Sequence, residues 1–176
     1  GSVTSTGHPF FDYLIAFVIW VIGLGSPTQH TVDMIAPYFP PIMAALTIIP
    51  VYFISKTVFS RWVGVIAAGL VAILPGEFLG RSILGFTDHH VAETLFSTTA
   101  VMFVLLALKN AKRSEITWSQ IRHPKGTGLI KPAVYAMLGG VFLGVYHAAW
   151  MGATLFVGIL AAFLLVQFCI EHLNKT

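Results

Sequence analysis

One short stretch of the sequence carries most of its chemically reactive side chains. It holds one arginine, two histidines and two carboxylates, in the order Arg81, Asp88, His89, His90 and Glu93. Carboxylate oxygens and imidazole nitrogens are ligands that suit Mn²⁺, Zn²⁺ or Mg²⁺ more than Ca²⁺. Because Asp88 and His90 are two residues apart, both side chains can converge on one ion at a helix start or in an extended turn. The stretch therefore predicts part of a metal site, to which other segments must add ligands.

Arg81 and the helix expected after the two histidines favour an anion beside that metal. Arginine binds phosphate or carboxylate through two parallel hydrogen bonds. A helix that begins near Val91 offers unpaired N–H groups and the positive end of its dipole. A helix cap would explain Asp88 alone, but it would not explain two adjacent histidines. Together these features suit a phosphate-bearing ligand.

The composition places this stretch in a membrane protein. Hydrophobic residues make up 56% of the 176 residues and charged residues only 10%, whereas a soluble domain has about 25% charged residues. The chain cannot bury so much apolar surface in a core of its own, so lipid must cover part of it. The single cysteine excludes a disulfide framework. The basic residues do not cluster on a soluble face, which argues against nucleic acid as a partner.

The apolar segments predict an all-α fold, a polytopic transmembrane helical bundle with about five spans and a short interfacial helix. The run from Phe10 to Leu24 is shorter than the roughly 20 residues that a span needs, so it is expected to lie at the interface. The expected order is the end of an outer loop with this short helix (1–36), two transmembrane helices (37–75), an outer loop with the acidic and histidine motif (76–92), a transmembrane helix (93–108), a basic cytoplasmic loop (109–131) and two transmembrane helices (132–176).

Small residues recur every four positions in the last apolar segment, at Gly140, Gly144, Ala148 and Gly152. Small residues let the backbones of two membrane helices approach each other closely. The stripe therefore predicts a helix-packing face.

The basic residues predict how the bundle is oriented in the membrane. If the segment 109–131 is cytoplasmic, alternating spans place nine of the ten Lys and Arg residues on that side, and only Arg81 on the other. Lysine and arginine are enriched in cytoplasmic loops. We therefore expect a multi-pass protein of the cell membrane with the motif on its outer face. His8 lies on the same face if the short first helix does not span.

Functions outside enzymology account less well for the motif. A metal or anion transporter, with the motif as its entry site, would need ionisable groups or broken helices near mid-membrane, whereas the polar cluster lies at the rim. A structural membrane subunit whose loop binds a partner leaves the adjacent Asp88, His89 and His90 unexplained. Surface chemistry on a lipid headgroup is the preferred interpretation, with the transporter as the alternative.

The run from Arg81 to Glu93 resembles the second acidic motif of oligosaccharyltransferase catalytic subunits, most closely those of archaea. Shorter pieces agree along essentially the whole chain, with Phe-Phe-Asp at 10–12, Tyr-Phe-Pro-Pro-Ile at 38–42, Ile-Pro-Val-Tyr at 49–52 and Ala-Trp-Met-Gly at 149–152. The resemblance implies part of a membrane domain of the GT-C type. That family transfers a glycan from a polyprenyl (dolichyl) phosphate or pyrophosphate to asparagine in Asn-X-Ser/Thr sequons.

The resemblance also implies roles for individual residues. Asp88 and His90 would bind a divalent metal, Mn²⁺ or Mg²⁺, with Zn²⁺ as a further option. Asp88 and Arg81 would be catalytic, while His89 and His8 would lie beside the lipid phosphate. The implied reaction is inverting, without a covalent enzyme intermediate: the metal neutralises the leaving phosphate and carboxylates engage the asparagine amide. The partners implied are the lipid-linked oligosaccharide donor, the acceptor polypeptide and membrane lipid, and no nucleic acid.

Several parts of the family pattern are absent from this sequence. They are the first acidic motif, the later glutamate that contacts the acceptor, the Trp-Trp-Asp-Tyr-Gly motif and the soluble C-terminal domain. The resemblance therefore implies a membrane-embedded fragment that is inactive alone and has the remainder of the enzyme as a partner. A protein O-mannosyltransferase of related architecture is the alternative within the enzyme class.

Overall fold

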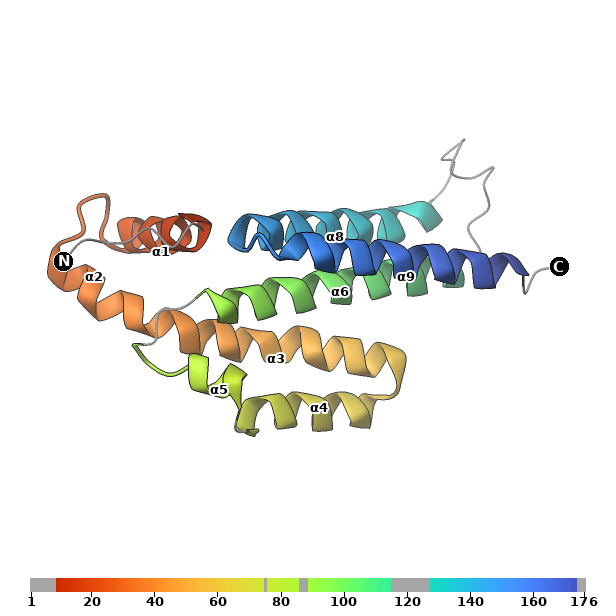
Figure 1. The fold of residues 1–176 in the computed structure, drawn as a ribbon, viewed down its shortest axis with the longest axis horizontal. Coiled ribbons are helices and arrows are strands. Elements are labelled where there is room, and N and C mark those ends of the chain that lie inside the picture. Colours follow the sequence, from red (N-terminus) through yellow and green to blue (C-terminus); the bar gives the residue numbers. More distant parts are fainter. Residues whose placement is uncertain (1–8, 75, 86–88, 115–126, 174–176) are drawn as a thin grey trace.

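The computed structural model describes residues 9–74, 76–85, 89–114 and 127–173, and within these ranges it consists of helices without a β-strand (Figure 1). The helices follow one another as α1 (Pro9–Ile22), α2 (Gln29–Ile35), the 3₁₀ turn η1 (Ala36–Tyr38), α3 (Phe39–Val58), α4 (Arg61–Ile73), α5 (Glu77–Arg81), α6 (His90–Arg113), the 3₁₀ turn η2 (Thr127–Leu129), α8 (Ile130–Ala149) and α9 (Ala153–Leu173).

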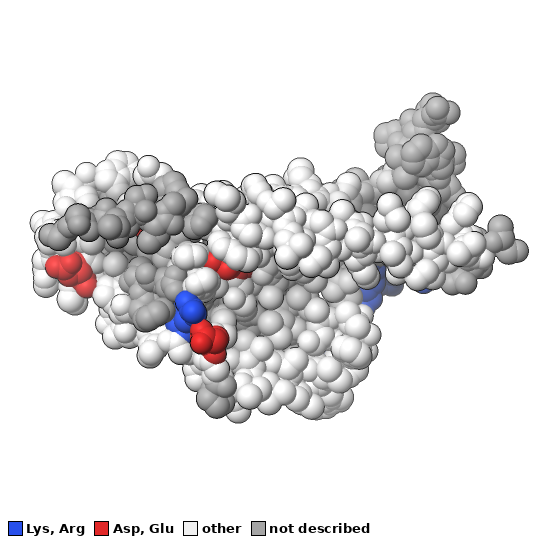
Figure 2. Space-filling view, in the orientation of Figure 1, with Lys and Arg blue, Asp and Glu red and all other residues white. Residues whose placement is uncertain are grey.

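Four stretches of the described chain are long and apolar enough to cross a membrane. They are residues 29–58, in which α2, η1 and α3 are continuous, and the helices α6, α8 and α9. Only 6% of the most apolar part of α9 is buried inside the protein, and charged side chains are sparse on the face shown in Figure 2. Such surface requires lipid or further protein to cover it. The prediction of an all-α, multi-pass membrane bundle is therefore confirmed.

The segment after Phe59 forms a helix that is shorter than a membrane span. α4 has 13 residues, or about 20 Å, while the hydrocarbon core of a bilayer is about 30 Å thick. The Ser60 hydroxyl caps its start by accepting a hydrogen bond from the Val63 N–H, and the backbone becomes extended at Leu74. The sequence predicts about five spans, and α4 accounts for the difference from the four long helices.

α6 is the central helix of the bundle, with α3 and α8 packed against it and α4 packed against α3 (Figure 1). The buried core gathers near the beginning of α6. Its residues come from five helices: Phe11, Ile15, Ile19, Met43, Val91, Ala92, Phe96, Tyr146, Ala149 and Ala153. The three residues from α1 are spaced four apart and share one helix face. They hold α1 over the end of the bundle where the polar motif lies.

Gly139 is the small residue through which α8 approaches α6. A Cβ atom at Gly139 would lie 3.3 Å from Cγ2 of Val104, while a Cβ at Gly140 or Gly144 would meet no atom within 4 Å. Among the described residues, then, no helix packs against the predicted stripe at Gly140 or Gly144. Successive residues of a helix point about 100° apart, so the residue next to the stripe faces α6 instead.

Gly64 lets α3 and α4 pack closely. A Cβ atom there would lie 2.9 Å from the carbonyl oxygen of Tyr52, which is backbone and cannot rotate away. We expect Gly64→Ala to force the helices apart and to lower the free energy of unfolding by about 1–3 kcal/mol. The thermal unfolding midpoint in detergent measures this change. Gly69→Ala, in open space on the same helix, is the matched control and should be neutral or stabilising; equal losses at both positions would contradict the packing argument.

Candidate functional site

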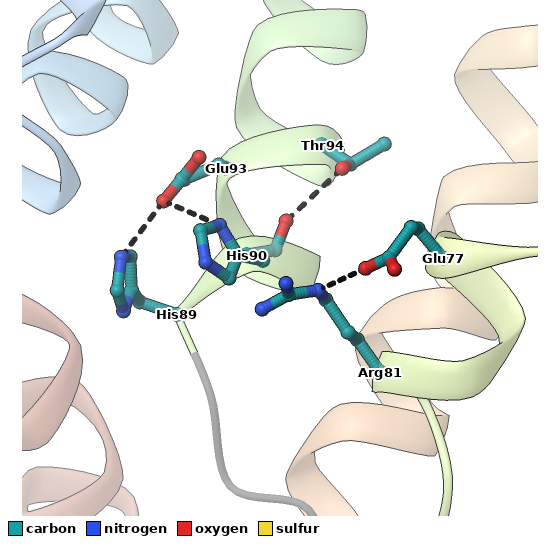
Figure 3. Close-up of polar contacts among 6 residues, drawn as sticks. All are labelled: Glu77, Arg81, His89, His90, Glu93 and Thr94. Atoms are coloured by element: carbon teal, nitrogen blue, oxygen red, sulfur yellow. Dashed lines mark hydrogen bonds and ion pairs between the residues drawn. The ribbon is translucent and has the colours of Figure 1, made fainter.

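Arg81 ends the short helix α5 and is oriented by a residue one turn earlier. Its Nε atom donates a hydrogen bond to Oε2 of Glu77 at 2.7 Å. The Glu77 side chain is 86% exposed, so this ion pair contributes at most about 1 kcal/mol to stability. Its consequence is geometric, because it limits where the Arg81 guanidinium can lie (Figure 3).

The chain between α5 and α6 is tied to η1, the turn that precedes α3. The N–H of Gly85 donates to the carbonyl oxygen of Pro37 at 3.2 Å, and Gly85 has φ +88°, which favours glycine. The buried hydroxyl of Ser82 donates to the carbonyl oxygen of Leu79 at 2.8 Å. The first bond positions the motif relative to the long helical stretch 29–58, and the second fixes the chain at the end of α5.

α6 begins at His90, with His89 at its N-cap position. The Glu93 N–H donates to the carbonyl oxygen of His89 at 3.0 Å, and the Thr94 hydroxyl donates to that of His90 at 3.0 Å. The segment expected as an outer loop, 76–92, thus contains α5 and the start of α6. Since no Pro or Gly follows His90 in the first turns, the helix can extend to the histidines themselves.

Glu93 brings the two histidines together in this first turn. Its Oε1 atom lies 3.0 Å from Nε2 of His89 and 3.2 Å from Nδ1 of His90 (Figure 3). The two imidazole rings have centroids 4.4 Å apart and are tilted by 31°. Because Glu93 follows the histidines by four and three residues, all three share one face of the helix start. The result is a compact group of possible metal-ligand atoms, two imidazole nitrogens and one carboxylate oxygen.

This group of donors fits a divalent metal. One ligand atom from each of His89, His90 and Glu93 can be chosen so that all three lie within 4.8 Å of one another. The Oε1 atom of Glu93 is buried, and both of its imidazole contacts lack the alignment of a hydrogen bond. A buried carboxylate oxygen needs a cation or a donor to offset its lost hydration. Mixed nitrogen and oxygen ligands suit Zn²⁺ and Mn²⁺.

A cavity of about 320 Å³ connects this group to Arg81. It lies between α5 and the start of α6 and is lined by Glu77, Phe78, Arg81, His90, Val91, Glu93 and Thr94. Arg81 and His90 thus face one space from two different helices. A cation held at His90 and an anion held at Arg81 would be neighbours there.

The structure brings together three of the residues singled out by the sequence. Arg81 and His90 line the cavity, and His89 joins His90 at Glu93. Asp88 and His8 lie outside the described residues. Glu93 belongs to the sequence motif, but no role was predicted for it. Its spacing of three and four residues from two histidines was the signal that could have revealed it.

Comparison with known proteins identifies the family. Residues 4–176 match the family model described as oligosaccharyl transferase STT3, N-terminal. The dolichyl-monophosphooligosaccharide–protein glycotransferase AglB of Haloferax volcanii is 33% identical over 164 residues, which are 93% of this chain and 16% of that protein. Dolichyl-phosphooligosaccharide-protein glycotransferase 3 of Archaeoglobus fulgidus is 33% identical over 170 residues, 96% of this chain and 18% of that protein. The chain therefore spans less than a fifth of the length of these two relatives.

Solved structures share the fold. The Archaeoglobus fulgidus oligosaccharyltransferase tethered to an acceptor peptide with the NVT sequon matches 89% of this chain and 17% of its own, with a TM-score of 0.75 and 31% identity. AglB from the same organism, in complex with an inhibitory peptide and a dolichol-phosphate, matches 89% of this chain and 17% of its own, with a TM-score of 0.74 and 31% identity. A complex of the Archaeoglobus fulgidus enzyme with Zn and sulfate has a TM-score of 0.71 and 32% identity, over 89% of this chain and 18% of its own. The motif that first suggested the family, the helical membrane fold and the match along residues 4–176 agree, and the chain belongs to the STT3 oligosaccharyl transferase family.

Proposed function

We propose that this chain is part of the catalytic subunit of an archaeal-type oligosaccharyltransferase. The enzyme would transfer a glycan from a dolichyl phosphate or pyrophosphate to the side-chain nitrogen of asparagine in Asn-X-Ser/Thr. The observation that carries the proposal is the convergence of His89, His90 and Glu93 beside the Arg81 cavity, in a chain of this family. The relatives bear the name of protein glycotransferases with dolichyl-linked donors, which favours this reaction over O-mannosyl transfer and over transport.

Asp88 and His90 are the proposed ligands of a resident metal, Mn²⁺ or Mg²⁺. The nitrogen and oxygen donors of the described residues suit such an ion, and a related enzyme has been solved with Zn and sulfate. The metal, when bound, would neutralise charge that develops on the leaving phosphate. His90 would hold this ion in place from the first turn of α6, and Asp88, two residues earlier, would reach it from the preceding backbone.

Arg81, His89 and His8 are proposed to bind the phosphate of the lipid donor. Arg81 lines the same cavity as His90, so its guanidinium can contact phosphate oxygens that lie next to the metal ligands. The N–H groups in the first turn of α6 and the positive end of its dipole favour the same anion. Asp88 would also engage the amide of the acceptor asparagine, which makes its nitrogen more reactive toward the sugar without a covalent enzyme intermediate.

We place this site on the outer face of the membrane. The helix α5, which begins at Glu77 and ends at Arg81, lies near one end of the bundle, while the connection between α3 and α4 and the end of α6 lie at the other (Figure 1). Figure 2 shows acidic and basic side chains toward the first end and basic ones toward the second. The basic residues of the connection between α3 and α4 and of the end of α6 are Lys56, Arg61, Lys109, Lys112 and Arg113. Their clustering at one end supports a cytoplasmic position for that end, and hence an outer position for the motif.

The test of this function is glycan transfer by the full-length gene product that contains residues 1–176. The purified protein is given a polyprenyl-phosphate glycan, Mn²⁺ and a fluorescent peptide with Asn-X-Thr. We expect a glycopeptide to form, and none when Gln replaces the asparagine. Transfer to the serine or threonine of both peptides would contradict the proposal in favour of O-linked transfer, and metal flux into vesicles without any transfer would favour the transporter.

A further inference from the structure

Glu93 contacts both histidines but has no part in the reaction as proposed. Its side chain is only 12% exposed, and its Oε1 atom is fully buried. The helix fixes its backbone, since the Glu93 N–H donates to the His89 carbonyl oxygen at 3.0 Å. The carboxylate is therefore held in one place, bridging one nitrogen of each of two rings whose centroids are only 4.4 Å apart.

The contacts distinguish the two nitrogens of each ring. Glu93 lies against Nε2 of His89 and against Nδ1 of His90. A carboxylate beside one imidazole nitrogen favours the proton on that nitrogen, which leaves the lone pair on the other. A metal takes the nitrogen that has the lone pair. In this arrangement Nε2 of His90 and Nδ1 of His89 are the ring nitrogens that carry the lone pair.

We propose that Glu93 is a positioning residue that orients both histidines, so that the metal binds His90 through Nε2 while Nδ1 stays with the Glu93 carboxylate. The inference rests on the proposed function, because it takes His90 as a metal ligand. A metal on Nε2 makes the Nδ1–H more acidic and therefore a better donor. Small rotations of the rings would then turn the two contacts, now at ion-pair distance, into aligned hydrogen bonds.

A direct bond from Glu93 to the metal is the rival arrangement, and it makes a different prediction about His90. The ring atom near Oε1 is Nδ1, at 3.2 Å. A metal bound to Oε1 and to this neighbouring nitrogen would use Nδ1 as its ligand. The positioning role requires Nε2 instead. The nitrogen that His90 offers to the metal therefore decides between the two.

The first measurement is the Mn²⁺ affinity of the full-length gene product, from the EPR signal of free Mn²⁺. Loss of an outer partner of a metal-binding histidine costs about 10–100-fold in affinity, and we expect that loss for Glu93→Ala. Glu93→Gln should retain more affinity, because its amide oxygen still accepts a hydrogen bond from Nδ1–H. Glu171→Gln removes an exposed carboxylate on α9 and serves as the control without effect.

The second measurement replaces His90 by Nδ1-methylhistidine, which blocks the contact with Glu93 and leaves Nε2 open. We expect Mn²⁺ binding to persist with a loss similar to that of Glu93→Ala. Adding Glu93→Ala to the methylated protein should not lower the Mn²⁺ affinity further, because both changes remove the same contact. Complete loss of binding on methylation would show that Nδ1 is the ligand and would overturn the proposal.

The outcomes also separate this inference from the proposed function. If His90→Ala abolishes Mn²⁺ binding while Glu93→Ala and Glu93→Gln leave the affinity unchanged, the positioning role is wrong and the metal site stands. If the unaltered protein binds no Mn²⁺, or if His90→Ala binds Mn²⁺ equally well, both the positioning role of Glu93 and the proposed metal site are wrong. The thermal unfolding midpoint of Glu93→Gln shows whether α6 stays intact, so that loss of fold is not mistaken for loss of the contact.

Discussion

His90→Ala in the full-length gene product is expected to reduce glycan transfer by more than about 100-fold. Loss of an outer partner of a metal ligand already costs about 10–100-fold, and loss of the ligand itself should cost more. His90 is the proposed metal ligand in the first turn of α6, and alanine has no donor to replace it. The side chain is 38% exposed and lines a cavity. Removing it takes one imidazole away from the buried Glu93 carboxylate, which His89 still contacts, so the free energy of unfolding should fall by no more than about 1–3 kcal/mol. The much larger loss of transfer should then be one of chemistry.

The control for this prediction is His30→Ala. His30 is an exposed histidine on α2, outside the residues that line the cavity. It should leave both transfer and the thermal unfolding midpoint unchanged. Initial rates with a saturating peptide measure the effect for both variants. A His90→Ala protein that transfers glycan at the rate of the His30→Ala protein would remove His90 from the mechanism.

Arg81→Ala is expected to lower the rate of transfer by about 10–100-fold, because a hydrogen bond to a charged group is worth about 1.5–3 kcal/mol. Arg81 shares a cavity with His90, where its guanidinium would contact the donor phosphate. Its partner Glu77 is 86% exposed, so the substitution leaves no buried unpaired carboxylate there. The effect should therefore appear in transfer and not in the thermal unfolding midpoint.

Two variants sharpen the test of Arg81. Arg81→Lys keeps the positive charge but loses the planar, two-pronged contact, so its rate should fall between those of Arg81→Ala and the unaltered protein. Arg61→Ala removes the first residue of α4, an arginine that lies over the Trp62 ring. The start of α4 is at the end of the bundle away from α5 (Figure 1). Arg61→Ala should therefore leave the rate unchanged. Equal rates for Arg81→Ala and Arg61→Ala would contradict a role for Arg81 in phosphate binding.

The sequence was sufficient to predict the class of protein and the family to which it belongs. Long apolar runs are a direct signature of membrane helices, and they gave α3, α6, α8 and α9 with small errors at the ends. The motif stood out because charged and histidine side chains are costly near a membrane unless they have partners. Its residue types and spacing were enough to suggest a metal and a phosphate, and to suggest the family that the comparisons then showed.

The details that the sequence did not predict depend on contacts between helices or on helix ends. The start of α6 at His90 is one of these, because a polar segment before an apolar run reads as a loop until its backbone hydrogen bonds are known. The contacts of Glu93 appear only once the helix places its carboxylate beside both rings. Gly139 was missed because a four-residue stripe of small residues was present one position away, and only packing against Val104 distinguishes the two faces.

Mn²⁺ binding by the full-length gene product, compared with that of Asp88→Ala, tests the central claim most directly, because it asks whether the motif is a metal site without requiring turnover. We predict one tightly bound Mn²⁺ in the unaltered protein and its loss in Asp88→Ala, with glycan transfer lost in parallel. Asp33→Ala, at an exposed position on α2, should bind Mn²⁺ as the unaltered protein does. If Asp88→Ala retains the same Mn²⁺ affinity and the same rate of transfer, the motif is a helix start with surface histidines, and the metal site lies elsewhere.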